Sequence, residues 1–198
     1  RLQTWATRMI VSLAQLIEQQ QNRPPVTIAI AMADEAAVQL ARMAGEKGIA
    51  NFVFIGRPDR IKALAAEQGM AADAHPIVEC DDEKKAAAMA IAMVRNGEAD
   101  LPMKGLMQTG RFMRAVLDKT NGIPAARRIS QITVFAGSTG RLQFLTDCAI
   151  NVSLNLATKK DIIQNAVGVA RALGYECPRV ALIGAVETVS EAMPDTID

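Results

Sequence analysis

The sequence of 198 residues has few aromatic side chains, no excess of one charge and no long apolar run. Only 4% of the residues are aromatic, which argues against a surface that stacks nucleic-acid bases. Lys and Arg (22) nearly balance Asp and Glu (21), and this excludes a generally basic nucleic-acid-binding protein. The longest wholly apolar run, 86–94, is about half as long as the roughly 18 residues of a membrane span.

Cysteine and histidine are too sparse for a metal or thiol site. The three cysteines, Cys80, Cys148 and Cys177, lie far apart and are odd in number, and His75 is the single histidine. There is no zinc-binding pattern and no Cys–His pair, so we expect no metal and a reducing, cytoplasmic environment. His75 is predicted to lie in a surface loop. The N-terminal stretch mixes charges and glutamines with apolar residues, unlike a secretory signal.

Half of the residues are apolar and 22% are charged, which is enough for a sizeable core. Hydrophobic periodicity predicts helices over 2–22, 34–47, 58–69, 81–96, 109–119 and 158–173, with another near Glu187. It predicts strands over 26–32, 51–55, 76–80, 99–103 and 180–183, and a hairpin of 132–135 with 142–145. This alternation indicates βαβ units, so we expect an α/β fold with a mainly parallel sheet.

The segment 120–130 breaks the alternation with glycine, proline and a pair of arginines. We interpret it as the crossing between two α/β lobes, which gives the predicted domains 1–124 and 125–198. The chain begins with arginine rather than methionine and stops soon after a predicted helix begins. We therefore expect a fragment of a longer protein.

Basic residues concentrate where the predicted strand that ends at Met103 turns into the helix that begins at Thr109. From Met103 to Arg128 there is one acidic residue, Asp118, against six basic ones: Lys104, Arg111, Arg114, Lys119, Arg127 and Arg128. Ligands of open α/β sheets bind where strand ends meet helix starts, and free N–H groups at a helix start add partial positive charge. The cluster predicts a site for phosphate or another small anion, or alternatively an N-cap followed by a solvated helix face.

Three other features are open between a functional and a structural interpretation. Asp147 follows a predicted strand and is either an acid of the site or a cap for the turn after it. Gly184, Glu187 and Thr188 lie in a second strand-to-helix turn, where they either face a ligand or cap the helix. The segment 137–140 lacks the lysine spacing and strand–helix context of a phosphate loop, so we interpret it as a hairpin turn.

Several segments in order along the chain resemble the phosphate acetyltransferase and phosphate butyryltransferase family, and the butyryl branch more closely. These segments are Met103–Lys119, Ile129–Phe135, Leu145–Asn151, Ile162–Gly174 and Pro178–Val189. The resemblance implies two α/β/α lobes with mainly parallel sheets, in an isocitrate/isopropylmalate dehydrogenase-like architecture. A Ser-Arg pair and an Asp complete the family's site near its C-terminus and have no equivalent here. We therefore expect an incomplete second lobe and a chain that alone binds weakly or is inactive.

The resemblance implies a phosphate acyltransferase, acetyl or butyryl, that exchanges an acyl group between coenzyme A and inorganic phosphate. The implied partners are acyl-CoA, inorganic phosphate and acyl phosphate, with coenzyme A as a substrate, no bound cofactor or metal, no nucleic acid and no membrane. A homodimer or larger homo-oligomer is expected. The alternative is a non-catalytic regulatory module that binds acyl-CoA or acyl phosphate, such as the transferase-like domain fused to some malic enzymes.

The resemblance also implies roles for individual residues. Arg114 matches the arginine of the family's Thr-x-x-x-x-Arg pattern and is the expected phosphate ligand. Thr109 would donate a hydroxyl or cap the helix start, so these two are the expected catalytic residues. Substrate binding would fall to further residues of this turn and of a facing wall across the lobe boundary: Lys104, Gly105 and Arg111 in the turn, and Gly184, Glu187 and Thr188 in the wall.

Overall fold

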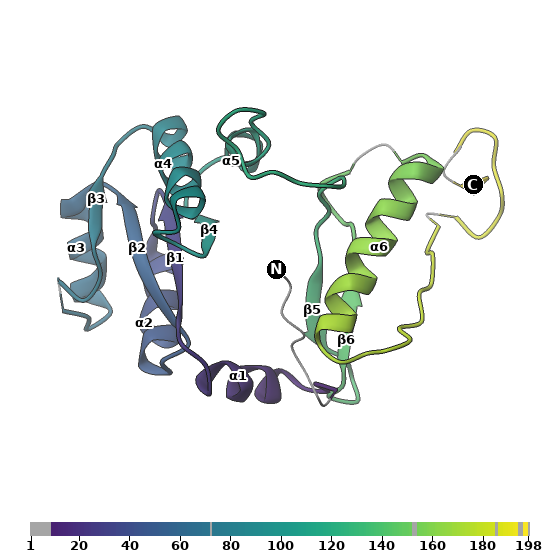
Figure 1. Cartoon of the computed structure of the whole chain (residues 1–198), viewed down its shortest axis with the longest axis horizontal. Coiled ribbons are helices and arrows are strands. Elements are labelled where there is room, and N and C mark those ends of the chain that lie inside the picture. Colours follow the sequence, from purple (N-terminus) through teal and green to yellow (C-terminus); the bar gives the residue numbers. More distant parts are fainter. Residues whose placement is uncertain (1–8, 72, 152–153, 185, 194–195, 198) are drawn as a thin grey trace. The chain divides into compact units, whose positions relative to one another are not determined.

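The structure is a computed structural model that describes residues 9–71, 73–151, 154–184, 186–193 and 196–197. The chain forms two compact units, each of which can be followed in Figure 1. The sheet unit comprises Ile17–Pro124. The hairpin unit comprises Ala125–Asp198 and the start of the chain up to Leu16. Residues 9–16 thus group with the hairpin unit, and the functional lobes 1–124 and 125–198 stay a prediction.

The sheet unit contains a four-stranded parallel sheet in the order β3-β2-β1-β4. The strands are β1 (Val26–Ala31), β2 (Ala50–Gly56), β3 (Ile77–Glu79) and β4 (Leu101–Lys104). The helices between and after them are α2 (Glu35–Glu46), α3 (Pro58–Glu67), α4 (Glu83–Asn96) and α5 (Thr109–Val116). This unit confirms the predicted α/β fold with a mainly parallel sheet.

The helix boundaries of this unit follow from local chemistry. Asp34 caps α2 by accepting a hydrogen bond from the Ala37 N–H at 3.0 Å, and Asp82 caps α4 in the same way from the Lys85 N–H at 2.7 Å. Gly97 ends α4 in the left-handed conformation that glycine adopts without strain. These caps and the strand ends thus place each loop at a defined edge of the sheet.

The sheet has a helical layer on each face, as Figure 1 shows. Alternate residues of β1 point to opposite faces, because side chains of a strand alternate. Ile30 packs with Phe52, Phe54 and the buried sides of α2 and α3. Ala29 packs on the other face with small residues of α4, and α5 lies against the same cluster. Alanines in β1 and α4 allow that helix to approach the sheet closely.

The hairpin unit contains fewer elements. Strands β5 (Thr133–Ala136) and β6 (Leu142–Leu145) form an antiparallel pair, as the sequence predicts, and α6 (Leu156–Ala172) follows. Helix α1 (Leu13–Gln21) begins in this unit and ends in the sheet unit. A small core cluster contains Ile10, Leu142 and Leu173. None of the helices that the structure describes is long and apolar enough to cross a membrane.

Two predictions for the hairpin unit are wrong within the described residues. The N-terminal helix does not include residues 9–12, because the Ile10 N–H donates to the Leu173 carbonyl and the Val11 carbonyl accepts from Leu142. The rest of its predicted start, residues 2–8, lies outside the described residues. Residues 180–183 form no strand, and the described residues near Glu187 form no helix. A strand needs a partner for its backbone groups, and the described part of this unit offers residues 180–183 none.

Candidate functional site

The strand order of the sheet unit defines where a ligand would bind. From β1 the chain proceeds through β2 to β3 in one direction, and then crosses back so that β4 lies on the other side of β1. In open α/β sheets the crevice outside the carboxyl ends of the strands at such a switch point is the usual binding site. Here it lies between the loop after β1, which starts at Met32, and the loop after β4, which starts at Gly105.

Gly105 lets these two loops meet. Its N–H donates to the Ala31 carbonyl at 2.8 Å, and the next residue, Leu106, donates to the Met32 carbonyl at 2.9 Å. A Cβ atom at Gly105 would overlap the Met32 carbonyl group, so only glycine fits without a backbone shift. Met32 itself has a φ of 57°, a left-handed conformation that is uncommon for a side chain of this kind. The sequence predicted Gly105 as part of the site, and the structure gives it this packing requirement.

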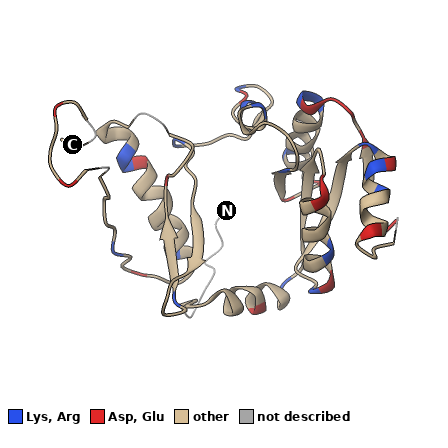
Figure 2. Ribbon diagram, turned by 180° about the vertical axis from the view of Figure 1, so that it is seen from behind, with Lys and Arg blue, Asp and Glu red and all other residues tan. Residues whose placement is uncertain are grey.

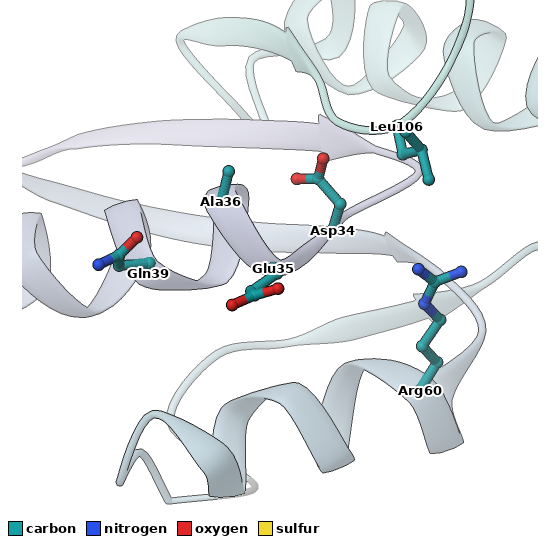
Figure 3. Close-up of a pocket in the computed structure, with 6 residues that line it drawn as sticks. All are labelled: Asp34, Glu35, Ala36, Gln39, Arg60 and Leu106. Carbon is teal, nitrogen blue, oxygen red and sulfur yellow. The ribbon is translucent and has the colours of Figure 1, made fainter.

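Two hollows lie along this carboxyl edge. The first, here called the Arg57 hollow, has a volume of about 250 Å³ and is lined in part by Met32, Arg57, Arg60, Glu83 and Leu106. The second, here called the Glu35 hollow, has a volume of about 450 Å³ and is lined by the residues labelled in Figure 3: Asp34, Glu35, Ala36, Gln39, Arg60 and Leu106. Arg60 and Leu106 line both, so the hollows adjoin at the starts of α2 and α3.

The predicted basic turn occupies the segment from the end of β4 into α5. Lys104 is the last residue of β4 and is partly exposed, and Arg114 is exposed on α5. Thr109 is the first residue of α5 rather than its cap; Gln108 holds the cap position and makes no side-chain capping bond. The prediction that Thr109 caps the helix is therefore wrong, because the helix starts one residue earlier than a cap at Thr109 requires. Its hydroxyl is exposed and available for other contacts.

Arg111 is held by a charged partner. Its Nη1 atom lies 2.9 Å from Oε2 of Glu83, the first residue of α4, and the two side chains are 51% and 29% exposed. A pair this exposed contributes at most about 1 kcal/mol to stability. Glu83 also lines the Arg57 hollow. The pair thus connects the predicted basic turn to that hollow.

The three predicted residues of the facing wall belong to the hairpin unit. Gly184, Glu187 and Thr188 are exposed and lie in an irregular segment. Glu187 and Thr188 cap no helix there, because no helix follows them among the described residues. The structure places Lys104, Gly105, Thr109, Arg111 and Arg114 in the sheet unit, whereas Arg127 and Arg128 of the predicted basic cluster belong to the hairpin unit. The approach of the turn to the wall stays a prediction.

Asp147 acts as a cap for its turn. Its carboxylate accepts hydrogen bonds from the N–H groups of Ala149, Ile150 and Asn151 and from the Asn151 side chain. Partial burial alone would raise the pKa of Asp147, but these hydrogen bonds to the charged form outweigh it and lower the pKa. Asn151 also accepts from Arg128 and donates to the Ile129 carbonyl at 2.9 Å. This network connects the turn to the start of the hairpin unit. It favours the interpretation of Asp147 as a cap of the turn over its interpretation as an acid of the site.

Sequence reasoning missed the residues that line the Arg57 hollow. Arg57 is the N-cap residue of α3 and Arg60 lies in its first turn, while Glu83 is the first residue of α4. The available signal was two arginines, on either side of Asp59, at the start of a helix, where acidic residues are favoured and basic ones are not. Figure 2 marks Lys and Arg on α5 and charges of both signs on the other helices of the sheet unit. In the part of the chain that the structure describes, no three His, Cys, Asp or Glu side chains cluster as metal ligands would.

Comparisons with known proteins agree with this architecture. The family described as "Phosphate acetyl/butaryl transferase" matches residues 81–198, more than half of the chain. The "Phosphate butyryltransferase" of Clostridium acetobutylicum is 39% identical over 192 residues, which are 96% of this chain and 64% of that protein. The "Phosphate acetyltransferase" of Rhizobium meliloti is 37% identical over 177 residues, which are 88% of this chain and 56% of that protein.

Solved structures give the same result for the fold. The branched-chain phosphotransacylase from Enterococcus faecalis superposes with a TM-score of 0.67 at 26% identity, over 87% of this chain and 60% of that one. A phosphotransacetylase from Streptococcus pyogenes shares the fold with a TM-score of 0.58 at 17% identity, over 73% of this chain and 54% of that one.

The fold and the family match thus define an α/β chain of the phosphotransacylase type. The chain belongs to the phosphate acetyl/butyryl transferase family, as its resemblance predicted. It spans about 60% of the length of the curated relatives named above.

Proposed function

We propose that the protein that contains this chain transfers an acyl group, acetyl or butyryl, between coenzyme A and inorganic phosphate. Membership of the family supports the reaction, and the names of the relatives, phosphate butyryltransferase and phosphate acetyltransferase, support the acyl class. The observation that carries the proposal for this chain is the basic turn after β4, at the switch point of the parallel sheet. That position is where such a sheet binds its ligands.

The reaction requires a well-positioned phosphate. A phosphate oxygen attacks the thioester carbonyl of acyl-CoA, the carbon–sulfur bond breaks, and the thiolate of coenzyme A leaves and takes a proton. The products are acyl phosphate and free coenzyme A. Phosphate is a poor nucleophile unless it is fixed in line with the carbonyl, and positioning of this kind supplies up to about 7–11 kcal/mol in ideal cases. Fixed cationic and N–H donors also stabilise the charge that develops on the carbonyl oxygen.

In this proposal the Arg114 guanidinium binds the phosphate through two parallel hydrogen bonds, and the Thr109 hydroxyl donates a hydrogen bond to the same phosphate. Lys104 and Arg111 add positive charge at the same turn, and Gly105 keeps the backbone close to the substrate. The wall that faces them contains residues of the second lobe: Gly184, Glu187 and Thr188. We also propose that the functional lobes are 1–124 and 125–198.

The same proposal covers the setting of the protein. Coenzyme A is a substrate and no cofactor or metal takes part in the transfer. The three free cysteines, Cys80, Cys148 and Cys177, fit a reducing, cytoplasmic environment. Acyl-CoA, inorganic phosphate and acyl phosphate are the partners, and the protein assembles into a homodimer or larger homo-oligomer.

The experiment uses the complete protein encoded by the reading frame that contains these 198 residues. Release of free thiol from butyryl-CoA and acetyl-CoA is measured with and without inorganic phosphate. We expect release only with phosphate, together with formation of acyl phosphate. Equal release without phosphate would indicate a hydrolase and contradict the proposal. Binding of acyl-CoA without turnover would support the non-catalytic regulatory module instead.

The Arg114→Ala substitution tests the phosphate ligand. Because a guanidinium that stabilises the transition state is worth about 10²–10³ in rate, we expect kcat/KM for phosphate to fall by about that factor. Arg141→Ala is the matched control, since Arg141 is an exposed arginine of the hairpin unit outside the proposed site. An unchanged phosphate dependence in Arg114→Ala would remove Arg114 from the site.

A further inference from the structure

Two arginines of the Arg57 hollow have no role in the function proposed above. Arg57 is the N-cap residue of α3 and directly follows Gly56, the last residue of β2. Arg60 lies one turn further along α3 and lines both hollows. Figure 3 shows the Arg60 side chain extending from α3 towards the side on which Asp34 and Leu106 lie. Both guanidinium groups thus belong to the carboxyl edge of the sheet, at a strand-to-helix turn different from the predicted one.

Two cations stand at the start of this helix, with one acidic residue, Asp59, between them in its first turn. The start of a helix carries a partial positive charge, so acidic side chains are stabilising there and cations are not. Arg57 makes no side-chain capping bond, although Ser, Thr, Asp or Asn at the same position would make one. Residues that break a local preference without a compensating contact are expected mainly at functional sites. An anion bound between the arginines would add to the compensation that the single carboxylate of Asp59 gives.

The acidic residues of the hollows are largely engaged elsewhere. Asp34 caps α2 through its Oδ1 atom, and Glu83 pairs with Arg111. Glu35 lies in the first turn of α2 and lines the Glu35 hollow only. Within the residues that the structure describes, Arg57 and Arg60 form no ion pair and no side-chain hydrogen bond. The Arg57 hollow therefore presents two arginines without an ion-pair partner, beside a Glu83 carboxylate that pairs with Arg111.

The apolar part of the hollow limits which anion fits. Met32, Ile61 and the exposed Leu106 line it beside the arginines. This combination suits a phosphate group on a larger organic molecule better than a fully hydrated ion, because the organic part would cover the apolar surface. A volume of about 250 Å³ is too small for a whole coenzyme A molecule but accommodates a phosphate group and its neighbouring atoms.

We infer that Arg57 and Arg60 form a phosphate-binding subsite in the Arg57 hollow, separate from the basic turn after β4. The inference rests on the proposed function, in which both substrates carry phosphate: inorganic phosphate itself, and coenzyme A through its nucleotide phosphates. Guanidinium groups are suited to either, because they offer two parallel hydrogen bonds to phosphate oxygens. The adjoining apolar surface favours the phosphates of coenzyme A.

The test uses the double variant Arg57→Gln/Arg60→Gln, which removes both charges and keeps a polar, unbranched side chain at each position. Lys62→Gln is the matched control, because Lys62 is an exposed cation on the same helix and does not line either hollow. Steady-state kinetics are measured with butyryl-CoA, with butyryl-pantetheine, which lacks the nucleotide phosphates, and with varied inorganic phosphate. Loss of two charge-assisted contacts should raise the relevant KM by about 10- to 100-fold.

Each kinetic result decides the inference. A higher KM for butyryl-CoA, with unchanged values for butyryl-pantetheine and phosphate, supports binding of the coenzyme A phosphates. A higher KM for inorganic phosphate with both thioesters supports binding of the phosphate substrate at this subsite. KM values within twofold of the wild type for all three, in an active protein, overturn the inference while leaving the proposed function intact.

A binding measurement separates failure of the subsite from failure of the proposed function. The melting temperature of the wild type is compared with and without coenzyme A or inorganic phosphate, which requires no turnover. We expect one of these ligands to raise it, and the double variant to lose that increase. The unliganded double variant should melt at the same or a slightly higher temperature, because two cations leave the start of α3. No ligand-induced increase in the wild type, or a lower melting temperature in the unliganded variant, would overturn the inference.

Discussion

The sheet unit and the hairpin unit differ in how completely their apolar residues are buried. Among the described residues, 23 of the buried apolar ones belong to the sheet unit, and only five, Ile10, Leu142, Ile162, Ala170 and Leu173, belong to the hairpin unit. The sheet unit has helices on both faces of a four-stranded parallel sheet, whereas the hairpin unit has two strands. Parallel sheets are stable when both faces are covered, and two-stranded pairs alone are marginal.

The apolar segment 180–183, which follows α6, shows how this difference in burial decides the structure of an apolar run. Leu182 and Ile183 are 71% and 87% exposed, although their residue types are typical of a buried strand. In the sheet unit a similar run, β1, is buried because β2 and β4 pair with it on both sides. The same kind of sequence therefore becomes a core strand or an exposed segment according to the partners that the unit provides.

The largest expected effect comes from deleting a core ring in the sheet unit. Phe54 is 2% exposed in the centre of β2, so Phe54→Ala should reduce the free energy of unfolding of this unit by about 3–5 kcal/mol. Phe144→Ala in β6 should cost less, because Phe144 is only partly buried and its ring contacts Tyr175 at the edge of a small cluster. Urea unfolding combined with hydrogen exchange of segments from each unit measures both.

The exchange data also test the comparison between the units. Amides of β1 and β2 should exchange most slowly in the wild type, and those of β5 and β6 faster, since local stability follows buried apolar contacts. An equal loss of stability from the two phenylalanine substitutions would show that the hairpin unit is as firmly packed as the sheet unit. That result would contradict the difference argued from burial.

A smaller effect is expected where the two loops of the switch point meet. Gly105→Ala should destabilise the sheet unit by about 1–3 kcal/mol, because the new methyl group overlaps the Met32 carbonyl. Gly110→Ala in α5 is the matched control, since a methyl group there meets no atom within 4 Å and alanine favours the helix by up to about 1 kcal/mol. Thermal unfolding of both variants gives the comparison, and equal melting temperatures would refute the close approach of the loops.

Most of the sheet unit could be predicted from the sequence, because local signals and tertiary structure agree there. Asp34, Asp82 and Gly97 mark helix ends that the structure retains, and apolar runs mark the strands. The hairpin unit was predicted less well, because long-range contacts decide its structure. Residues 9–12 have helical periodicity, yet the backbone groups of Ile10 and Val11 bond to other segments instead. Periodicity alone does not contain that information.

Only part of the candidate site could be predicted, because some of its residues are adjacent in the sequence and others are brought together by the fold. The basic turn after β4 is visible in the sequence because its charges are adjacent, and Gly105 is at the end of a recognisable strand. Arg57 and Glu83 are 26 residues apart and line one hollow only because β2 and α4 lie at the same edge of the fold. The long separation in sequence hid this hollow, and it also hid the ion pair between Arg111 and Glu83.

The smallest expected effect concerns the single histidine, which only the sheet unit contains. The rings of Phe52 and Phe54 contact His75 edge-on at 5.5 and 5.6 Å, and burial lowers the pKa of His75 below its ordinary value of 6.5. The folded sheet unit therefore disfavours the charged form, and its stability should decrease as the pH falls below 6.5 through the lowered pKa, because the unfolded chain binds the proton first. His75→Phe keeps an aromatic ring and removes the titration, so the difference in unfolding free energy between variant and wild type should grow over this pH range. Carboxyl groups titrate equally in both proteins and cancel, and parallel pH profiles would show that His75 does not pack half-buried against these rings.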